Sequence, residues 1–233
     1  MSEWITIKST DGDSFDAYVA KPEDGSGPAV LVIQEIFGVN ANLRAISDKL
    51  AGDGFIAVAP DLFWRQERRV DITDQTEEEW AKAFELYKGF NVDKGVKDLG
   101  ATLEAARKIE GSTGKVGCVG YCLGGLLAYL MATRTDIDAS VGYYGVGIDG
   151  TLTESANIRK PLLLHIAKED GFVDKEAQAK MHQGLDGNDL VTLIDYAGVD
   201  HGFTRKGGQH YDEAAATKAN QTSLDFLKTN LKG

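Results

Sequence analysis

The sequence of 233 residues predicts an α/β protein with a mostly parallel sheet of about eight strands and helices on both faces. Short apolar runs bounded by turn residues alternate with longer amphipathic stretches, which is the pattern of parallel strands joined by helices. No linker, low-complexity stretch or internal repeat interrupts this alternation. One large sheet can hold a chain of this length, so we expect residues 1–233 to form a single domain.

The strands are predicted from polarity and from the turn residues around them. Residues 4–8 and 15–20 alternate in polarity on either side of Asp11-Gly12-Asp13, which is typical of an antiparallel hairpin at a sheet edge. Six more strands are expected. Residues 29–34 form a nearly continuous apolar run, which is typical of a strand covered on both faces, and residues 55–59 form another buried strand. The other four are residues 115–120, 139–144, 161–167 and 190–196.

The longer stretches between the strands have helical spacing. The expected helices are residues 42–51, a stretch beginning at Thr76, and residues 93–109, 123–133, 175–183 and 212–231. Gly52 and Gly54 end the first of them, and three glutamates in the first turn of the second favour the positive end of the helix dipole. Residues 61–75 are polar and irregular, with Arg65, Arg68 and Arg69 close together.

Composition excludes several classes of function. The net charge of -11 repels nucleic acid, and no basic stripe with interleaved aromatics is present. No run approaches the roughly 18 apolar residues of a membrane span, and the N-terminus lacks the pattern of a signal peptide. We therefore expect a cytoplasmic protein with neither a nucleic-acid nor a membrane partner. The acidic composition is also compatible with a monomer.

The two cysteines, Cys118 and Cys122, lie on either side of a predicted strand-to-helix turn. Their side chains should diverge there, so we expect no disulfide. No second cluster of Cys or His lies near them, so we expect no zinc site. Two free thiols suit a reducing compartment. Cys118 lies within the strand and is expected to be an inert core residue.

Cys122 occupies the centre of a G-x-C-x-G motif at residues 120–124, where a buried strand leads into an apolar helix. This is the pattern of a nucleophile elbow, with cysteine in place of serine. Such a turn is strained, and side chains two residues away on either side would clash with backbone, which explains the glycines. The N–H of Leu123 can face a developing oxyanion, and the helix N-terminus favours a thiolate. The alternative is that Cys122 has only a structural role and fills space in a tight turn.

A nucleophilic thiol needs a base, and the base needs an orienting carboxylate. His201 lies in a loop directly after the last strand and is the favoured base. His165 sits among leucines within a strand and is expected in the core, whereas the other two histidines have polar neighbours typical of the surface. Asp170, just after the strand at 161–167, is the favoured acid. Its competitors are Glu169 and Asp174, and the order nucleophile, acid, histidine matches α/β-hydrolases.

The loop after the strand at 29–34 completes the predicted site. In this arrangement it supplies a second oxyanion N–H, here from Ile36. Glu35 ends a strongly apolar strand, where an unpaired carboxylate is costly. It is either solvated at the strand tip or placed as a titratable group beside Cys122.

With these segments in place, the sequence resembles the dienelactone hydrolases, also called carboxymethylenebutenolidases, from about Lys21 to the C-terminal helix. The motifs that carry the resemblance are residues 34–38, residues 120–125, residues 141–145, and His201 with Phe203 and Arg205. The resemblance implies an α/β-hydrolase fold without a cofactor or metal, and a triad of Cys122, His201 and Asp170. It also implies that Glu35 contacts the resting thiol and takes its proton when an anionic substrate binds.

Substrate recognition is implied less completely. The family binds the carboxylate of dienelactone with two arginines, and Arg205 matches one of them. Trp80 occupies the position of the second, and residues 76–91 contain no arginine. Arg65, Arg68 or Arg69 are alternatives, although a cluster of charges is more often solvated surface. The other expected substrate contacts are Phe37, Phe84, Tyr87 and Tyr144.

Three functions follow from these residues. The first is hydrolysis of dienelactone or a related small lactone or enol ester through a thioacyl-enzyme. The second is a general small-molecule carboxylesterase of the same fold, with the missing arginine as its signature. The third is a non-catalytic relative that binds a small ligand, against which the complete order of Cys122, Asp170 and His201 argues.

Overall fold

The computed structural model describes residues 2–233. Eight strands follow the order β1-β2-β4-β3-β5-β6-β7-β8 in the sheet. They are β1 (Ser2–Lys8), β2 (Ser14–Ala20), β3 (Gly27–Ile33), β4 (Ile56–Pro60), β5 (Ser112–Tyr121), β6 (Ala139–Tyr143), β7 (Leu162–Ala167) and β8 (Val191–Tyr196). The β1–β2 and β2–β4 pairs are antiparallel, whereas the β3–β4, β6–β7 and β7–β8 pairs are parallel. The predicted sheet, with its antiparallel edge hairpin, is confirmed.

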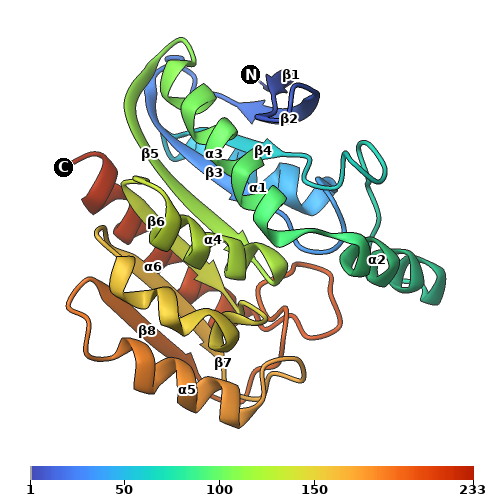
Figure 1. Ribbon diagram of the computed structural model, residues 1–233, viewed down its shortest axis with the longest axis vertical. Helices are drawn as coiled ribbons and strands as arrows, with labels where there is room; N and C mark the ends of the chain where they lie inside the picture. The colour runs from blue at the N-terminus through green and yellow to red at the C-terminus, as the bar shows by residue number, and fades with distance from the viewer. Residues whose placement is uncertain (1) are drawn as a thin grey trace. The chain divides into compact units, whose positions relative to one another are not determined.

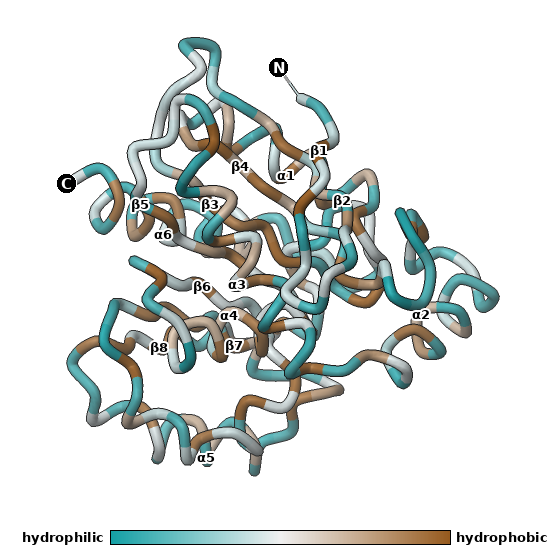
Figure 2. Tube along the Cα trace, turned by 45° about the horizontal axis from the view of Figure 1, so that its top comes forward, coloured by the Kyte–Doolittle hydropathy of each residue, from teal (hydrophilic) through white to brown (hydrophobic). Residues whose placement is uncertain are grey.

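The chain comprises two compact units, residues 1–117 and 118–233. In the first unit α1 (Ala41–Gly52) packs on β2, β3 and β4, and α3 (Val92–Lys108) packs on β1, β3 and β4. Figure 1 shows these two helices on opposite faces of the strands. Helix α2 (Glu77–Gly89) precedes α3. The buried strands β3 and β4 have almost no polar side chains, and Figure 2 shows β4 as a continuous apolar run.

The irregular segment at residues 61–75 is held by ion pairs. Arg65 pairs with the fully buried Asp98 of α3 and, at 2.7 Å, with Asp11. Arg69 pairs with Asp16 at 2.9 Å. Arg68 donates a hydrogen bond to the carbonyl of Ser14, and its guanidinium lies 5.5 Å from the ring of Trp64. The three arginines are therefore engaged within the first unit itself.

In the second unit α4 (Leu123–Arg134) packs on β6, β7 and the 3₁₀-helix η1 (Ile148–Asn157). Helix α5 (Lys175–Leu185) packs on β8 and η1. Helix α6 (Glu213–Leu231) packs on β6 and β7, and Figure 1 shows it on the face opposite α4. The sequence predicted every α-helix but missed η1. No helix within residues 2–233 combines the length and apolar character needed to cross a membrane.

The parallel strands of the second unit bring their carboxyl ends to one edge. Tyr143 of β6 lies beside His165 of β7, and Ala167 of β7 lies beside Tyr196 of β8. The hydrogen bonding between β7 and β8 continues just beyond β7, where the N–H of Lys168 donates to the Tyr196 carbonyl at 2.9 Å. The loops that follow β5, β6, β7 and β8 therefore meet at this edge. Polar and catalytic side chains collect at such an edge in α/β proteins.

Candidate functional site

Cys122 lies at the turn between β5 and α4, with φ of 55° and ψ of −114°. Few residues other than glycine adopt a positive φ, and holding one there costs of order 1–3 kcal/mol. Two hydrogen bonds hold this backbone. The Cys122 N–H donates to the Tyr143 carbonyl at 3.0 Å, and the Gly125 N–H donates to the Cys122 carbonyl at 2.9 Å. The turn has the strained geometry that the G-x-C-x-G motif predicted.

The glycines around Cys122 are required by close backbone contacts. A Cβ atom on Gly120 would lie 1.9 Å from the carbonyl oxygen of Gly124. A Cβ on Gly125 would lie 2.6 Å from the Tyr143 carbonyl oxygen and 2.7 Å from the Cα of Gly145. Because these neighbours are backbone atoms, no rotamer change can relieve the contacts. The spacing of the glycines therefore reflects the space available at the turn.

His201 and Asp170 form a buried pair on two neighbouring loops. Asp170 lies in the loop between β7 and α5, and His201 lies in the loop between β8 and α6. The His201 Nδ1 atom is 3.1 Å from Oδ1 and 3.0 Å from Oδ2 of Asp170. The Asp170 Oδ1 also accepts hydrogen bonds from the N–H groups of Phe172, at 2.8 Å, and Val173, at 3.1 Å. Two backbone donors thus fix the carboxylate that faces the histidine.

The two competing acids have other partners. Glu169 pairs with Lys175 at 3.1 Å, and more than half of its side chain is exposed. Asp174 caps the first turn of α5, where its Oδ1 accepts the N–H of Ala177 at 2.8 Å. Neither carboxylate takes the place of Asp170 beside His201.

The charges around His201 favour its protonated form. Burial is the largest single influence on its pKa and acts to lower it. The charge that Cys122 carries as a thiolate, together with hydrogen bonds to Asp170 and Cys122 and the charge of Asp170, outweighs burial and raises the pKa of His201 to about 10. His201 thus has Asp170 as a partner at Nδ1 and also hydrogen-bonds to Cys122. This arrangement can hold an imidazolium between two negative groups.

Aromatic side chains surround the His201 ring. The ring of Tyr144 lies edge-on at 4.9 Å, and its hydroxyl is 2.9 Å from the Thr204 hydroxyl. The ring of Phe172 also lies edge-on, at 4.8 Å, although half of this residue is exposed. Tyr144 was predicted as a substrate contact, and the structure places it beside the histidine. Phe172 was not predicted, because a phenylalanine in a loop gives no signal of its own.

Asp200 is a second residue that the sequence did not single out. Its Oδ1 accepts the N–H of His201 at 2.6 Å and the N–H of Gly171 at 2.8 Å. It therefore joins the loop that carries Asp170 to the loop that carries His201. Its position directly before a predicted catalytic histidine was the only available signal.

The predicted anion-binding residue, Arg205, lies in the same loop as His201. Its N–H donates to the Gly202 carbonyl at 2.8 Å, and its guanidinium folds over Gly202, where a Cβ would meet the Nη2 atom at 2.8 Å. Leu123, the predicted oxyanion donor, is the first residue of α4 and is buried. Leu123 thus directly follows Cys122 in the chain, and Arg205 shares the loop of His201.

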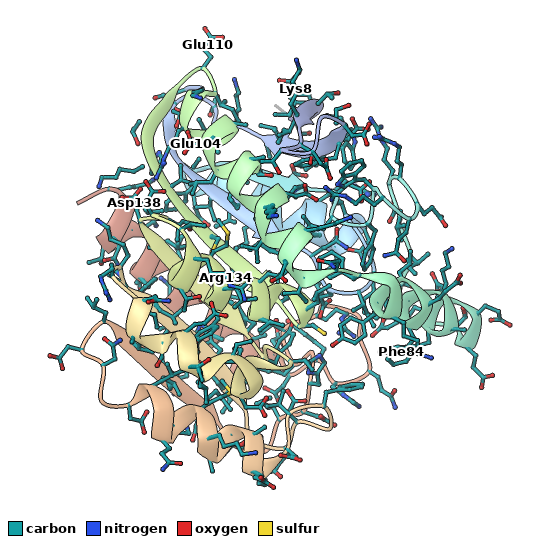
Figure 3. The ribbon with its side chains drawn as sticks, in the orientation of Figure 1. Lys8, Phe84, Glu104, Glu110, Arg134 and Asp138 are labelled. Carbon is teal, nitrogen blue, oxygen red and sulfur yellow. The ribbon has the colours of Figure 1, made fainter. Side chains whose placement is uncertain are left out.

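The remaining predicted residues belong to the first unit. Glu35, Ile36 and Phe37 follow β3 and are all buried. The ring of Trp80 meets Phe37 edge-on at 5.2 Å and stacks on Phe84 at 5.5 Å. Phe84, labelled on α2 in Figure 3, is 38% exposed. Tyr87 on the same helix is exposed to the same extent. The predicted aromatic contacts Phe37, Trp80 and Phe84 therefore form one cluster.

The two cysteines differ in their surroundings, and both are free thiols. Cys118 is fully buried on β5, with its Sγ 3.4 Å from the Ser140 hydroxyl. Burial raises the pKa of the Cys118 thiol to about 12. Its environment is that of an unreactive core residue, whereas Cys122 lies at a helix N-terminus beside a histidine. Within residues 2–233, no three His, Cys, Asp or Glu side chains are arranged to hold a metal ion.

Known proteins resemble this chain over nearly its whole length. The model of the dienelactone hydrolase family matches residues 15–231. A protein of Azospirillum brasilense provisionally named a carboxymethylenebutenolidase is 48% identical over 97% of this chain and 98% of its own. The carboxymethylenebutenolidase of Pseudomonas putida is 39% identical over 97% of this chain and 96% of its own.

Solved structures agree with the sequence comparison. The crystal structure of a provisionally assigned dienelactone hydrolase from Klebsiella pneumoniae superposes with a TM-score of 0.85, at 25% identity and 97% coverage of both chains. The predicted α/β-hydrolase fold and the predicted family are confirmed. The chain therefore belongs to the dienelactone hydrolase family and is a carboxylic ester hydrolase.

Proposed function

We propose that this enzyme hydrolyses a small lactone or ester through a triad of Cys122, His201 and Asp170 and a thioacyl-enzyme intermediate. The observation that carries the proposal is the buried His201, which is hydrogen-bonded to Asp170 through Nδ1 and to Cys122 as well. A nucleophile, a base and an orienting carboxylate in contact are what nucleophilic catalysis needs.

In the proposed reaction the Cys122 thiolate attacks the carbonyl carbon and forms a tetrahedral intermediate. The N–H of Leu123, at the positive end of α4, stabilises the oxyanion, with the Ile36 N–H as the second donor. Collapse of the intermediate breaks the C–O bond, and the leaving oxygen takes a proton from His201. The His201 imidazole then deprotonates water, which attacks the thioester and releases the carboxylic acid and the Cys122 thiolate. Asp170 keeps the imidazole in the tautomer that carries its proton on Nδ1.

We further propose that Glu35 controls when the thiolate forms. The family resemblance implies that this carboxylate takes the proton of the resting thiol when an anionic substrate binds. Glu35 is only 6% exposed, and a buried carboxylate is costly unless its charge is balanced. Substitution of Glu35 by Gln removes this acceptor. We expect it to lower kcat for an anionic lactone more than for a neutral ester.

A dienelactone-like anion is the favoured substrate, and Arg205 is its proposed carboxylate partner. The relatives named carboxymethylenebutenolidase support this choice. One observation favours a broader carboxylesterase instead. Trp80 stands where the family has its second arginine, and it packs against the rings of Phe37 and Phe84. An aromatic cluster suits neutral, apolar ester groups better than a carboxylate.

The deciding experiment measures kcat/KM of the wild type and of Cys122→Ala on dienelactone and on p-nitrophenyl acetate. Efficient hydrolysis of dienelactone that is lost in the variant supports both the triad and the substrate. If only the simple ester is hydrolysed, the proposed triad is retained, but the enzyme is then a general carboxylesterase and not a dienelactone hydrolase by substrate. Activity that survives the substitution contradicts the proposed nucleophile.

We also propose that the protein acts as a monomer in the cytoplasm. Two free thiols suit a reducing compartment. Light scattering during gel filtration tests the first part, since a mass of twice 25.2 kDa would contradict it.

A further inference from the structure

Gln178 is a buried amide on α5 that the proposed mechanism does not use. It lies on the inner face of the helix with Met181 and Leu185, and only 1% of it is exposed. A buried amide is costly unless its polar atoms are hydrogen-bonded. The partners of this amide therefore indicate what it does.

The Gln178 Nε2 atom faces three backbone carbonyls. It lies 2.8 Å from the oxygen of Val173, 3.2 Å from that of Ala167 and 3.3 Å from that of Lys168. Ala167 ends β7, Lys168 begins the loop between β7 and α5, and Val173 lies near the end of that loop. One side chain thus ties together the two ends of the loop that carries Asp170.

A short chain of hydrogen bonds leads from this amide to the histidine. The Val173 carbonyl accepts from Gln178, and the Val173 N–H donates to Asp170 at 3.1 Å. The Asp170 carboxylate then holds the Nδ1 of His201 at 3.0 Å. A shift of Val173 would therefore move the carboxylate and, through it, the imidazole.

A further observation indicates that the amide serves the loop. The Gln178 Oε1 is buried and has no hydrogen-bond partner within the described residues, which is unfavourable by about 1–3 kcal/mol. The contacts of Nε2 with the three carbonyls must offset this cost.

We propose that Gln178 is a positioning residue, which fixes the loop that carries Asp170 and thereby orients His201 for catalysis. This inference rests on the triad of the proposed function. Gln178 does not touch the reacting atoms. Loss of its donors should therefore lower kcat, because catalysis is sensitive to small displacements of the catalytic groups, and should leave KM nearly unchanged.

The test compares Gln178→Met, which keeps the length of the side chain but removes the donors, with Gln183→Met on the exposed face of the same helix. With p-nitrophenyl acetate we expect kcat of Q178M to fall about 10- to 100-fold, while its KM and the kcat of Q183M stay within about threefold of wild type. Nuclear magnetic resonance of labelled histidines should show a lower pKa for His201 in Q178M, because Asp170 helps to raise it.

A third variant, Gln178→Glu, separates positioning from folding. A buried glutamate tends to stay protonated and keeps one O–H donor, so we expect its kcat to lie between those of Q178M and the wild type. If Q178M does not fold, the same comparison is made between Q178E and the wild type.

A folded Q178M with kcat within about threefold of wild type overturns the proposal, and so does a loss of kcat with unchanged titration of His201. Cys122→Ala, measured beside these variants, reports on the triad separately. If C122A stays active, the proposed function fails. If C122A is inactive and Q178M is fully active, only the role of Gln178 fails.

Discussion

Replacement of Asp170 by Asn should nearly abolish activity without disturbing the loop. The Oδ1 atom of Asp170 accepts the N–H groups of Phe172 and Val173, and an asparagine oxygen can accept both in the same place. The amide nitrogen must then take the position of Oδ2, which lies 3.0 Å from the Nδ1 of His201. Oδ1 is 3.1 Å from the same nitrogen, but two backbone donors already occupy it. An N–H donor would face Nδ1, so the imidazole proton would move to Nε2.

A histidine protonated on Nε2 cannot act as the base in the proposed reaction. The substitution also removes one of the negative charges that raise the pKa of His201. In serine hydrolases the equivalent change of tautomer costs about 10⁴-fold in kcat. We expect a loss of about 10³- to 10⁴-fold here, or about 4–5.5 kcal/mol of transition-state stabilisation.

The assay is the steady-state hydrolysis of p-nitrophenyl acetate by D170N, with Glu169→Gln as the matched control. Glu169 neighbours Asp170 but is exposed and pairs with Lys175, so E169Q should keep wild-type kcat. Thermal unfolding should show that both variants are folded. A D170N enzyme with kcat within about threefold of wild type would refute this reasoning, because the carboxylate would then not determine the tautomer of His201.

Three other predictions concern stability. Gly125→Ala should lower the free energy of unfolding by about 1–3 kcal/mol in urea titrations, because its Cβ would lie 2.6 Å from the Tyr143 carbonyl oxygen; wild-type stability would contradict the tight turn. Burial lowers the pKa of His165 from 6.5 to about 3. As the pH falls below 6.5 only the unfolded chain takes up this proton, so stability should fall by about 2 kcal/mol between pH 7.5 and pH 5. The His165→Gln variant should lose about 2 kcal/mol less stability than the wild type over the same pH range, and equal losses would contradict the lowered pKa of His165. Finally, the two compact units should unfold in one transition by both circular dichroism and tryptophan fluorescence, as a single domain does, whereas separate transitions would contradict that expectation.

Much of the site could be predicted because its signals are local. The glycines at 120 and 124 flank the nucleophile at a fixed spacing, and Gly120 is required because a Cβ there would meet the Gly124 carbonyl oxygen of the same turn. His201 and Asp170 could be selected because each follows a recognisable strand, and parallel strands bring their carboxyl ends together. The assignment of His165 to the core was also correct, because it too rests on a local signal. Its strand neighbours are all apolar, and the structure gives its ring nitrogens the hydroxyls of Tyr196 and Ser223 as partners.

The features that were missed depend on contacts between distant parts of the chain. The partners of Arg65 are Asp11 and Asp98, which are far away in sequence, so the cluster of arginines could equally have been free surface. The helix η1 has no clear periodicity in sequence. It begins at Ile148 after the N-cap residue Gly147, whose φ is 92°, and is supported by the hydrogen bond that the Tyr129 hydroxyl donates to the Thr151 carbonyl at 3.3 Å.

Gln178 shows the same limit within the site. A glutamine in an amphipathic helix is usually a surface residue, and nothing near it in sequence marks it as buried. Its role can be inferred only from the structure, in which its amide contacts the carbonyls of Ala167, before the loop, and Val173, near the end of the loop.

The most direct test of the account is to identify the residue that carries the acyl group. Wild-type enzyme is mixed with p-nitrophenyl acetate, quenched in acid within the first turnover, digested and analysed by mass spectrometry. We predict one acetyl group on Cys122, located by fragmentation because no Lys or Arg separates it from Cys118. We predict none on Cys118, whose buried thiol, with its pKa raised to about 12, serves as the internal control. An acetyl group on any other residue, or full activity without a covalent intermediate, would contradict the central claim that Cys122 is the nucleophile.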